Sequence, residues 1–278
     1  MEIPRIWEKE KADETTPDGD SMELTCWGWS KEGPAEARAK AGELLQQLRH
    51  RLRQGAEPGR YAYGSRLVRE EILRELPDAE GGLAAVVTRN VYGCEVLNTA
   101  GAMFIDVDLP PPPWSLGRLF GRRPSDPVEE RVNALRQIIE TDTWRAGRIY
   151  RTAAGLRLLI TDRLYEPASA DAEQLMTTCG ADPAFVRLCR VQKSFRARLT
   201  PKPWRCGAAR PPGRHPREDR QIQKDFERWL ARYETASAAW STCHLLAEAG
   251  SGRIHEEIAP LVHLHDEATR CGSGLPLA

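Results

Sequence analysis

Asp106 and Asp108 are the residues of this sequence whose spacing most directly suggests chemistry. On a β-strand, residues two apart project from the same face, about 6.6 Å from one another. Two carboxylates at that distance can share one or two hard cations, and a bound Mg²⁺ or Mn²⁺ would relieve their mutual repulsion and form an electrostatic centre for phosphoryl transfer. The alternative is a strand end with two solvated aspartates, because Asp-x-Asp alone is a weak motif.

A strongly basic segment offers a second kind of chemistry. Between residues 187 and 224 there are twelve lysines and arginines against two acids, Glu218 and Asp219. Such an imbalance can neutralise several phosphates. Phe195 and Trp204 interleave the cations, which suits base stacking on a single strand of nucleic acid. The alternative is a solvated loop whose arginines pair with acids elsewhere and whose tryptophan only packs.

The aspartates require a strand that places both on one face. Around them, apolar residues alternate with Phe104, Asp106 and Asp108, which is the period-two pattern of a strand with one apolar face. Prolines at 110–113 end this strand, so the aspartates are expected where it leaves the sheet. Residues 147–161 predict two further strands joined by a tight turn at 153–155, with Arg157 and Leu156 on opposite faces of the second strand.

The remaining elements complete an α+β fold with a mixed β-sheet core flanked by helices and a helical C-terminal region. Apolar spacing and helix-ending residues predict helices near 34–55, 67–76, 128–139 and 172–178, and further helices in the C-terminal third. Short apolar runs predict strands near 22–29, 83–88 and 195–199. Residues 114–127 are expected to form an exposed insertion, and residues 88–93 a turn that can present Arg89 and Asn90 to a ligand.

Composition favours one folded domain inside the cell. Hydrophobic residues make up 41% and charged residues 29% of the 278 residues, which is too apolar for a disordered chain. No apolar run reaches the roughly 20 residues that span a bilayer, and no signal peptide is visible, so we expect a cytoplasmic protein without a membrane partner. The seven cysteines contain no Cys-x-x-Cys pair and are expected to be reduced. A cluster of His263, His265, Asp266 and Cys271 matches no standard zinc spacing and is expected to pack.

Three ordered segments resemble a known family. The strand at 104–108 (FIDVD), residues 150–157 (YRTAAGLR) and residues 180–182 (GAD) are similar to the three motifs of archaeo-eukaryotic primases and primase-polymerases, over about residues 83–205. The polar residues at 1–20 predict a flexible arm, and apolar residues at helical spacing predict a helical extension at 217–278. The resemblance implies a primase-polymerase-like core at 21–216. It also implies Mg²⁺ or Mn²⁺ held by Asp106, Asp108 and Asp182, with residues 187–190 as the basic strand after the third motif.

The sequence departs from this family at the second motif. Arg157 stands at the position of the family's histidine, and Ala154 replaces the small hydroxyl residue. An arginine can still bind a triphosphate through a bidentate contact, so ligand binding can persist where polymerisation is lost. Asp182 precedes Pro183 and a predicted helix, which favours a helix N-cap over a metal ligand at this position. The residues expected to hold phosphates are Arg151, Arg157, Arg190, Arg196, Arg198 and Lys202.

Two functions follow as expectations. The first is a primase-polymerase-like protein that binds nucleotide or nucleic-acid phosphates through a divalent metal on Asp106 and Asp108, and that would act as a nucleotidyltransferase if active. The second is a non-catalytic nucleic-acid-binding or adaptor module that keeps the fold and the basic face without a metal. A hydrolase of another kind has no support, since no nucleophile elbow, P-loop or His-Glu-x-x-His motif is present.

Overall fold

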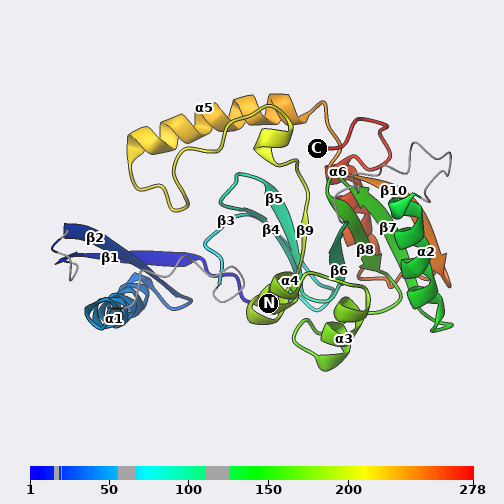
Figure 1. The fold of residues 1–278 in the computed structure, drawn as a ribbon, viewed down its shortest axis with the longest axis horizontal. Coiled ribbons are helices and arrows are strands. Elements are labelled where there is room, and N and C mark those ends of the chain that lie inside the picture. The colour runs from blue at the N-terminus through cyan, green and yellow to red at the C-terminus, as the bar shows by residue number, and fades with distance from the viewer. Residues whose placement is uncertain (16–18, 20, 56–66, 110–125) are drawn as a thin grey trace, which may run out of the picture.

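Residues 1–15, 19, 21–55, 67–109 and 126–278 are described by the structure, a computed structural model of the chain. Their strands form a two-stranded hairpin and two four-stranded sheets, and every pairing between these strands is antiparallel (Figure 1). The α+β class is therefore confirmed, while the expected mixture of parallel and antiparallel strands is not found among the described residues. None of the helices in these ranges has the length and apolar character needed to cross a bilayer.

The N-terminal unit is a hairpin packed on one long helix. Strand β1 (Ile6–Thr15) pairs with β2 (Ser21–Ser30), and α1 (Pro34–Arg53) lies against them. Gly28 permits this packing, because a Cβ there would overlap the backbone of Ala37 and Ala41. The unit has a small core of its own around Leu24, Leu45 and Leu52. The expected loose arm at 1–20 is thus wrong over residues 6–15, which are held by the ladder to β2.

The first four-stranded sheet has the order β3-β4-β5-β9. It consists of β3 (Glu71–Pro77), β4 (Leu83–Arg89), β5 (Glu95–Thr99) and β9 (Phe195–Arg198). The strands at 83–88 and 195–199 and the turn at 88–93 were predicted correctly. The helix predicted at 67–76 is wrong: its apolar spacing fits a helix, but pairing with the apolar strand β4 makes residues 71–77 an edge strand.

The second four-stranded sheet carries the paired aspartates. Its order is β10-β7-β8-β6, from β10 (Cys243–Gly250), β7 (Ala146–Thr152), β8 (Gly155–Ile160) and β6 (Phe104–Asp108). The predicted hairpin at 147–161 is confirmed. Because β10 pairs with β7, the C-terminal region contributes a strand to the core and is not only a helical extension. The alternation of apolar and polar residues over 247–249 was the overlooked signal.

The second sheet is covered on both faces. Helices α2 (Pro127–Glu140), α3 (Ala170–Thr178) and α4 (Pro183–Gln192) share a core with Ile105 and Val107. On the opposite face Phe104 packs among residues of the first sheet and of α6 (Ala259–Thr269) (Figure 1). Asp106 shares the face of Phe104, so it lies toward the space between the two sheets.

The C-terminal region contributes one more long helix. Helix α5 (Arg220–Ser237) follows the loop at 201–219, which includes the short 3₁₀ turn η2 (Pro203–Arg205). Its residues Phe226, Trp229 and Tyr233 pack with Cys206 in a separate cluster. The tyrosine hydroxyl donates to the carbonyl of Pro201 at 2.5 Å, and the indole of Trp229 donates to that of Ala209 at 2.8 Å. The loop is thereby fixed against α5.

All seven cysteines are free thiols, as expected. Burial raises the pKa of Cys94, Cys179 and Cys243 to about 11 and that of Cys189 to about 12. These four side chains are therefore protonated packing residues at neutral pH. The insertion expected at 114–127 lies almost wholly outside the described residues.

Candidate functional site

Asp106 forms an ion pair with Arg157, its partner in the register between β6 and β8. Nε of the arginine donates to one carboxylate oxygen at 2.8 Å, and Nη2 donates to the other at 3.1 Å. The arginine side chain is 1% exposed, while that of the aspartate is 42% exposed. Burial acts to lower the pKa of Arg157, but the adjacent carboxylate raises it above its ordinary value, so the guanidinium stays charged.

The buried His265 lies next to the guanidinium of Arg157. Nη1 of Arg157 donates to the carbonyl oxygen of Arg198 at 2.8 Å and lies 3.4 Å from Nε2 of His265. Nδ1 of His265 lies 3.0 Å from Asp266, which in turn pairs with Arg148 at 3.0 Å. Burial lowers the pKa of His265 to about 4, so the ring is neutral at pH 7 and can accept from Arg157 and donate to Asp266. The expected packing role of this histidine agrees with these contacts.

The other two predicted metal ligands have different surroundings. Asp108 is exposed at the end of β6. Asp182 is the N-cap of α4 and accepts from the backbone of Ala184 at 2.6 Å, which was the alternative left open by the sequence. Within the part of the chain that the structure describes, no group of three or more His, Cys, Asp or Glu residues is arranged to hold a metal ion. Both oxygens of Asp106 already accept from Arg157, so this donor set fits Mg²⁺ or Mn²⁺ poorly.

Two cations, Arg198 and Lys202, lie near the aspartate pair, and Arg205 lies near both of them. Arg198, Lys202 and Arg205 make no ion pair with any described residue. Nε of Arg198 and Nη1 of Arg205 are buried and have no hydrogen-bond partner among the residues that the structure describes. Burial lowers the pKa of Lys202, and Arg198 and Arg205 lower it further, whereas Asp108 acts in the opposite direction. Among the described residues, Asp106 and Asp108 are the carboxylates that act on Arg198 and Lys202, and neither forms an ion pair with them.

An exposed aromatic pair adjoins these cations. The rings of Tyr92 and Trp204 meet edge to face with centroids 5.4 Å apart, and the two residues are 41% and 45% exposed. Lys202 and Arg210 lie over the indole at 5.6 Å and 5.5 Å from its centroid. We call Arg198, Lys202, Arg205, Tyr92 and Trp204 together the cation–aromatic surface. It combines positive charge with planar groups on which bases can stack.

Several predicted binding residues have structural roles instead. Phe195 is fully buried in the core beneath the helices, so the stacking role predicted for it is wrong. Arg196 is buried and binds both oxygens of Glu70 at 2.7 Å and 3.0 Å, so it is not available to a phosphate. Arg151 donates to carbonyl oxygens of the β7–β8 turn, at 2.7 Å for that of Thr152.

The predicted basic strand at 187–190 is wrong, because these residues lie in α4. Pro183 at the first turn and the N-cap Asp182 begin a helix whose buried face includes Val186 and Cys189. Arg190 is directed outward and pairs with Glu173 at 3.5 Å. Of the predicted phosphate-binding residues, the structure brings together Arg157, Arg198 and Lys202.

Some residues of the site were not singled out from the sequence. Tyr92 lies in the turn between β4 and β5, far along the chain from Trp204, and only the folded sheet brings them into contact. Arg205 was one of twelve cations with no feature to distinguish it. Its distinguishing property is the absence of an acidic partner among the described residues, which the sequence does not reveal.

Comparisons of this chain with known protein families, with curated proteins and with solved structures find no match.

Proposed function

We propose that this protein binds single-stranded nucleic acid, or the phosphates of a nucleotide, on the cation–aromatic surface and without a metal ion. The observation that carries the proposal is the cluster of Arg198, Lys202 and Arg205, which has no acidic partner among the described residues and lies next to the exposed pair Tyr92 and Trp204. A non-catalytic binding or adaptor module is the function that this arrangement supports best.

Phosphate binding would relieve the repulsion of like charges at this surface. Burial lowers the pKa of Lys202, and repulsion from the neighbouring Arg198 and Arg205 lowers it further. A phosphate that contacts all three groups removes this repulsion and satisfies the free donors of Arg198 and Arg205. Stacking of a base on Trp204 would add about 1–3 kcal/mol without sequence preference.

The ion pair of Asp106 makes the aspartate strand compatible with a polyanion. A free carboxylate at this position would repel phosphates, but Arg157 binds both oxygens of Asp106 and neutralises its charge. Arg157 is in turn anchored to the carbonyl of Arg198, so the pair also fixes the backbone that carries one of the phosphate-binding cations. In this proposal Asp106 and Arg157 position the surface and do not perform chemistry.

The test is binding of a fluorescently labelled single-stranded oligonucleotide, followed by anisotropy over a range of salt concentrations. We expect Trp204→Ala and Lys202→Ala each to weaken binding by roughly tenfold, and Lys202→Ala to reduce the dependence on salt by about one phosphate contact. Lys224→Ala, on α5 and outside the surface, is the matched control. Binding that is unchanged in both surface variants would show that nucleic acid is held elsewhere or not at all.

Metal-dependent nucleotidyl transfer is the second candidate function. It is favoured by the 42% exposure of Asp106 and by the exposed Asp108 two residues along the same face. A divalent metal there would supply electrostatic stabilisation of a transferring phosphoryl group. Manganese-dependent thermal stabilisation that is lost in Asp108→Asn, together with primer extension, would support this candidate; absence of both would leave the metal-free binding module.

A further inference from the structure

Asp108 keeps a free carboxylate at the edge of the cation–aromatic surface. It is exposed at the end of β6 and forms no ion pair with any residue that the structure describes. Asp106, two residues earlier on the same face, differs because both of its oxygens accept from Arg157. A free carboxylate repels phosphate groups, so its presence here favours a ligand that also carries a hydrogen-bond donor.

The fold places this carboxylate near Lys202. Arg157 lies opposite Asp106 in the register between β6 and β8. Its Nη1 donates to the carbonyl oxygen of Arg198 at 2.8 Å, which joins the end of β6 to the segment that leads to Lys202. Burial and two arginines lower the pKa of Lys202, whereas Asp108 acts in the opposite direction. The two side chains are therefore within electrostatic reach of each other.

Hydrogen bonds fix the backbone on both sides of this arrangement. On one side, the amide of Leu109 donates to the carbonyl oxygen of Ala154 at 3.2 Å, which holds the end of β6 on the β7–β8 turn. On the other side, the carbonyl oxygen of Pro201 accepts from the hydroxyl of Tyr233 at 2.5 Å and from the thiol of Cys94 at 3.3 Å. A carboxylate and an ammonium group on fixed backbones are preorganised for two neighbouring parts of one ligand.

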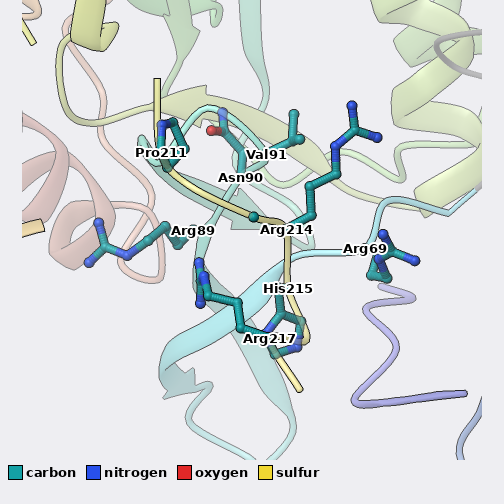
Figure 2. Close-up of a pocket in the computed structure, with 9 residues that line it drawn as sticks. Arg69, Arg89, Asn90, Val91, Pro211, Arg214, His215 and Arg217 are labelled. Atoms are coloured by element: carbon teal, nitrogen blue, oxygen red, sulfur yellow. The ribbon is translucent and has the colours of Figure 1, made fainter. Parts of the chain in front are cut away.

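Two glutamates of the first sheet are, by contrast, bound to arginines. Glu95 accepts from Arg89 at 3.1 Å, and Glu71 accepts from Arg217 at 3.1 Å. Figure 2 shows the guanidinium groups of Arg89 and Arg214 directed away from each other, so the arginines beyond the β4–β5 turn do not converge on one ligand group. These glutamates are paired within the fold, unlike the aspartate at the end of β6.

We propose that Asp108 accepts a hydrogen bond from a ribose 2′-hydroxyl of the bound strand, so that the protein prefers single-stranded RNA to single-stranded DNA. This preference presupposes the proposed function and specifies which nucleic acid the same surface binds. In a nucleotide the sugar lies between the phosphate and the base. With the phosphate on the cations and the base on Trp204, the sugar is the part that remains for a carboxylate beside Lys202. Deoxyribose lacks the 2′-hydroxyl and offers that carboxylate no donor at this position.

The experiment compares three labelled oligomers that differ only at the 2′-position of the sugar: oligouridylate, oligodeoxyuridylate and 2′-fluoro-oligouridylate. Fluorine keeps a ribose-like sugar conformation but cannot donate a hydrogen bond. In anisotropy titrations, we expect wild-type protein to bind oligouridylate roughly tenfold more tightly than either of the others, the size of one hydrogen bond to a charged group. Equal binding of oligouridylate and its 2′-fluoro analogue would overturn the inference, because the hydroxyl would then not be recognised.

Asp108→Ala removes both the acceptor and the charge, so it should abolish the preference. We expect oligouridylate binding to weaken by roughly three- to tenfold, while oligodeoxyuridylate binding stays the same or tightens by up to about threefold, because a repulsive charge is lost. Asp108→Asn keeps an acceptor oxygen without the charge and should retain a preference of about threefold. Damage to the fold would weaken both ligands and cannot produce this pattern.

Glu140→Ala is the matched control. Glu140 is an exposed carboxylate at the end of α2, which packs on the face of the second sheet opposite to Asp106. This variant should leave both affinities unchanged. Trp204→Ala should weaken oligouridylate and oligodeoxyuridylate by the same factor, since base stacking does not depend on the sugar.

The outcomes separate this inference from the proposed function. Equal affinity of wild-type protein for the two oligomers, both weakened by Trp204→Ala, would overturn the RNA preference and leave the proposed function intact. A preference that persists in Asp108→Ala would also overturn the inference. Binding of neither oligomer would contradict both. All titrations contain a chelator, and a preference for RNA that appears only with Mn²⁺ would assign Asp108 to a metal instead.

Discussion

Asp106 and Asp108 have different surroundings in the structure, although they occupy equivalent positions in the sequence pattern. Asp106→Asn would leave the guanidinium of Arg157, 1% exposed, without its counter-charge. Breaking a fully buried ion pair costs about 3–5 kcal/mol. Because Asp106 itself is half-exposed, we expect a smaller loss of about 2–3 kcal/mol in the free energy of unfolding. Asp108→Asn, at an exposed strand end, should change stability by no more than about 0.5 kcal/mol. Urea denaturation of both variants measures the difference.

A double variant tests the cause of this asymmetry. Asp106→Asn combined with Arg157→Gln removes both charges, so it should be less destabilised than the sum of the two single variants. Equal effects of Asp106→Asn and Asp108→Asn would contradict a structural role for the ion pair.

His265 makes stability depend on pH. Its pKa is lowered from 6.5 to about 4 in the folded protein, so between these values the unfolded chain binds more protons than the native one. The contribution of His265 to the free energy of unfolding is therefore complete above pH 6.5. It decreases by about 3 kcal/mol as the pH falls from 6.5 toward 4. His265→Gln should flatten this part of the profile in urea denaturation.

His263 is the matched control for this measurement, because it lies on the same helix and its side chain is 84% exposed. His263→Gln should leave the pH profile unchanged. If both variants behave alike, the acid sensitivity has another origin.

At the scale of elements, Gly155 allows β8 to pair closely with β6, because it has no side chain. It lies opposite Asp108 in the register, and a Cβ there would overlap the carbonyl oxygen of Val107. We expect Gly155→Ala to destabilise the protein by roughly 1–3 kcal/mol and to weaken oligonucleotide binding, because the strand pair anchors Arg157 and the backbone of Arg198. Thermal melting and anisotropy measure the two effects.

Gly42→Ala provides the contrasting case. Gly42 lies within α1, where a Cβ would meet nothing within 4 Å, so this variant should be slightly more stable than wild type. Destabilisation of the same size in both variants would contradict the role of close packing at Gly155.

The sequence predicted those strands and turns that a local residue pattern is sufficient to define. The period-two pattern around Asp106 and the turn at 153–155 define β6, β7 and β8 locally. Strand β3 was mistaken for a helix because it lies at a sheet edge and its identity depends on β4. The strands β5 and β10 were overlooked, and their places follow from partners far away along the chain.

The same distinction applies to the site. Asp106 and Arg157 were both identified from the sequence, but their ion pair depends on β6 lying next to β8 and on the register between them, neither of which local patterns fix. Trp204 was identified as a stacking residue, whereas its partner Tyr92 and the buried state of Phe195 follow only from the tertiary fold.

At the scale of the whole molecule, the N-terminal unit packs largely on itself. Its small core around Leu24 and Leu45 is separate from the large cores of the two sheets. The connections include ion pairs of Arg5 with Glu75 and of Lys9 with Glu218, which are exposed and contribute little to stability. We expect backbone amides of β1, β2 and α1 to exchange hydrogen at a lower opening free energy than those of β6 and β8.

Gly28→Ala sharpens this prediction, because the added Cβ would overlap the backbone of α1. Hydrogen exchange should then accelerate in the hairpin and α1 while protection of β6 and β8 is retained. Acceleration of equal size in all these elements would mean that the unit and the sheets unfold together.

Three of the deeply buried thiols can report how the molecule unfolds. Cys179 and Cys189 lie in the core beneath the helices, whereas Cys243 lies in the core between the sheets. With a pKa of about 11 or 12, these thiols present almost no thiolate to an alkylating reagent until the surrounding core opens. Mass spectrometry of alkylated peptides would therefore time the opening of each core separately, with reporters that the chain already carries and without any engineered label.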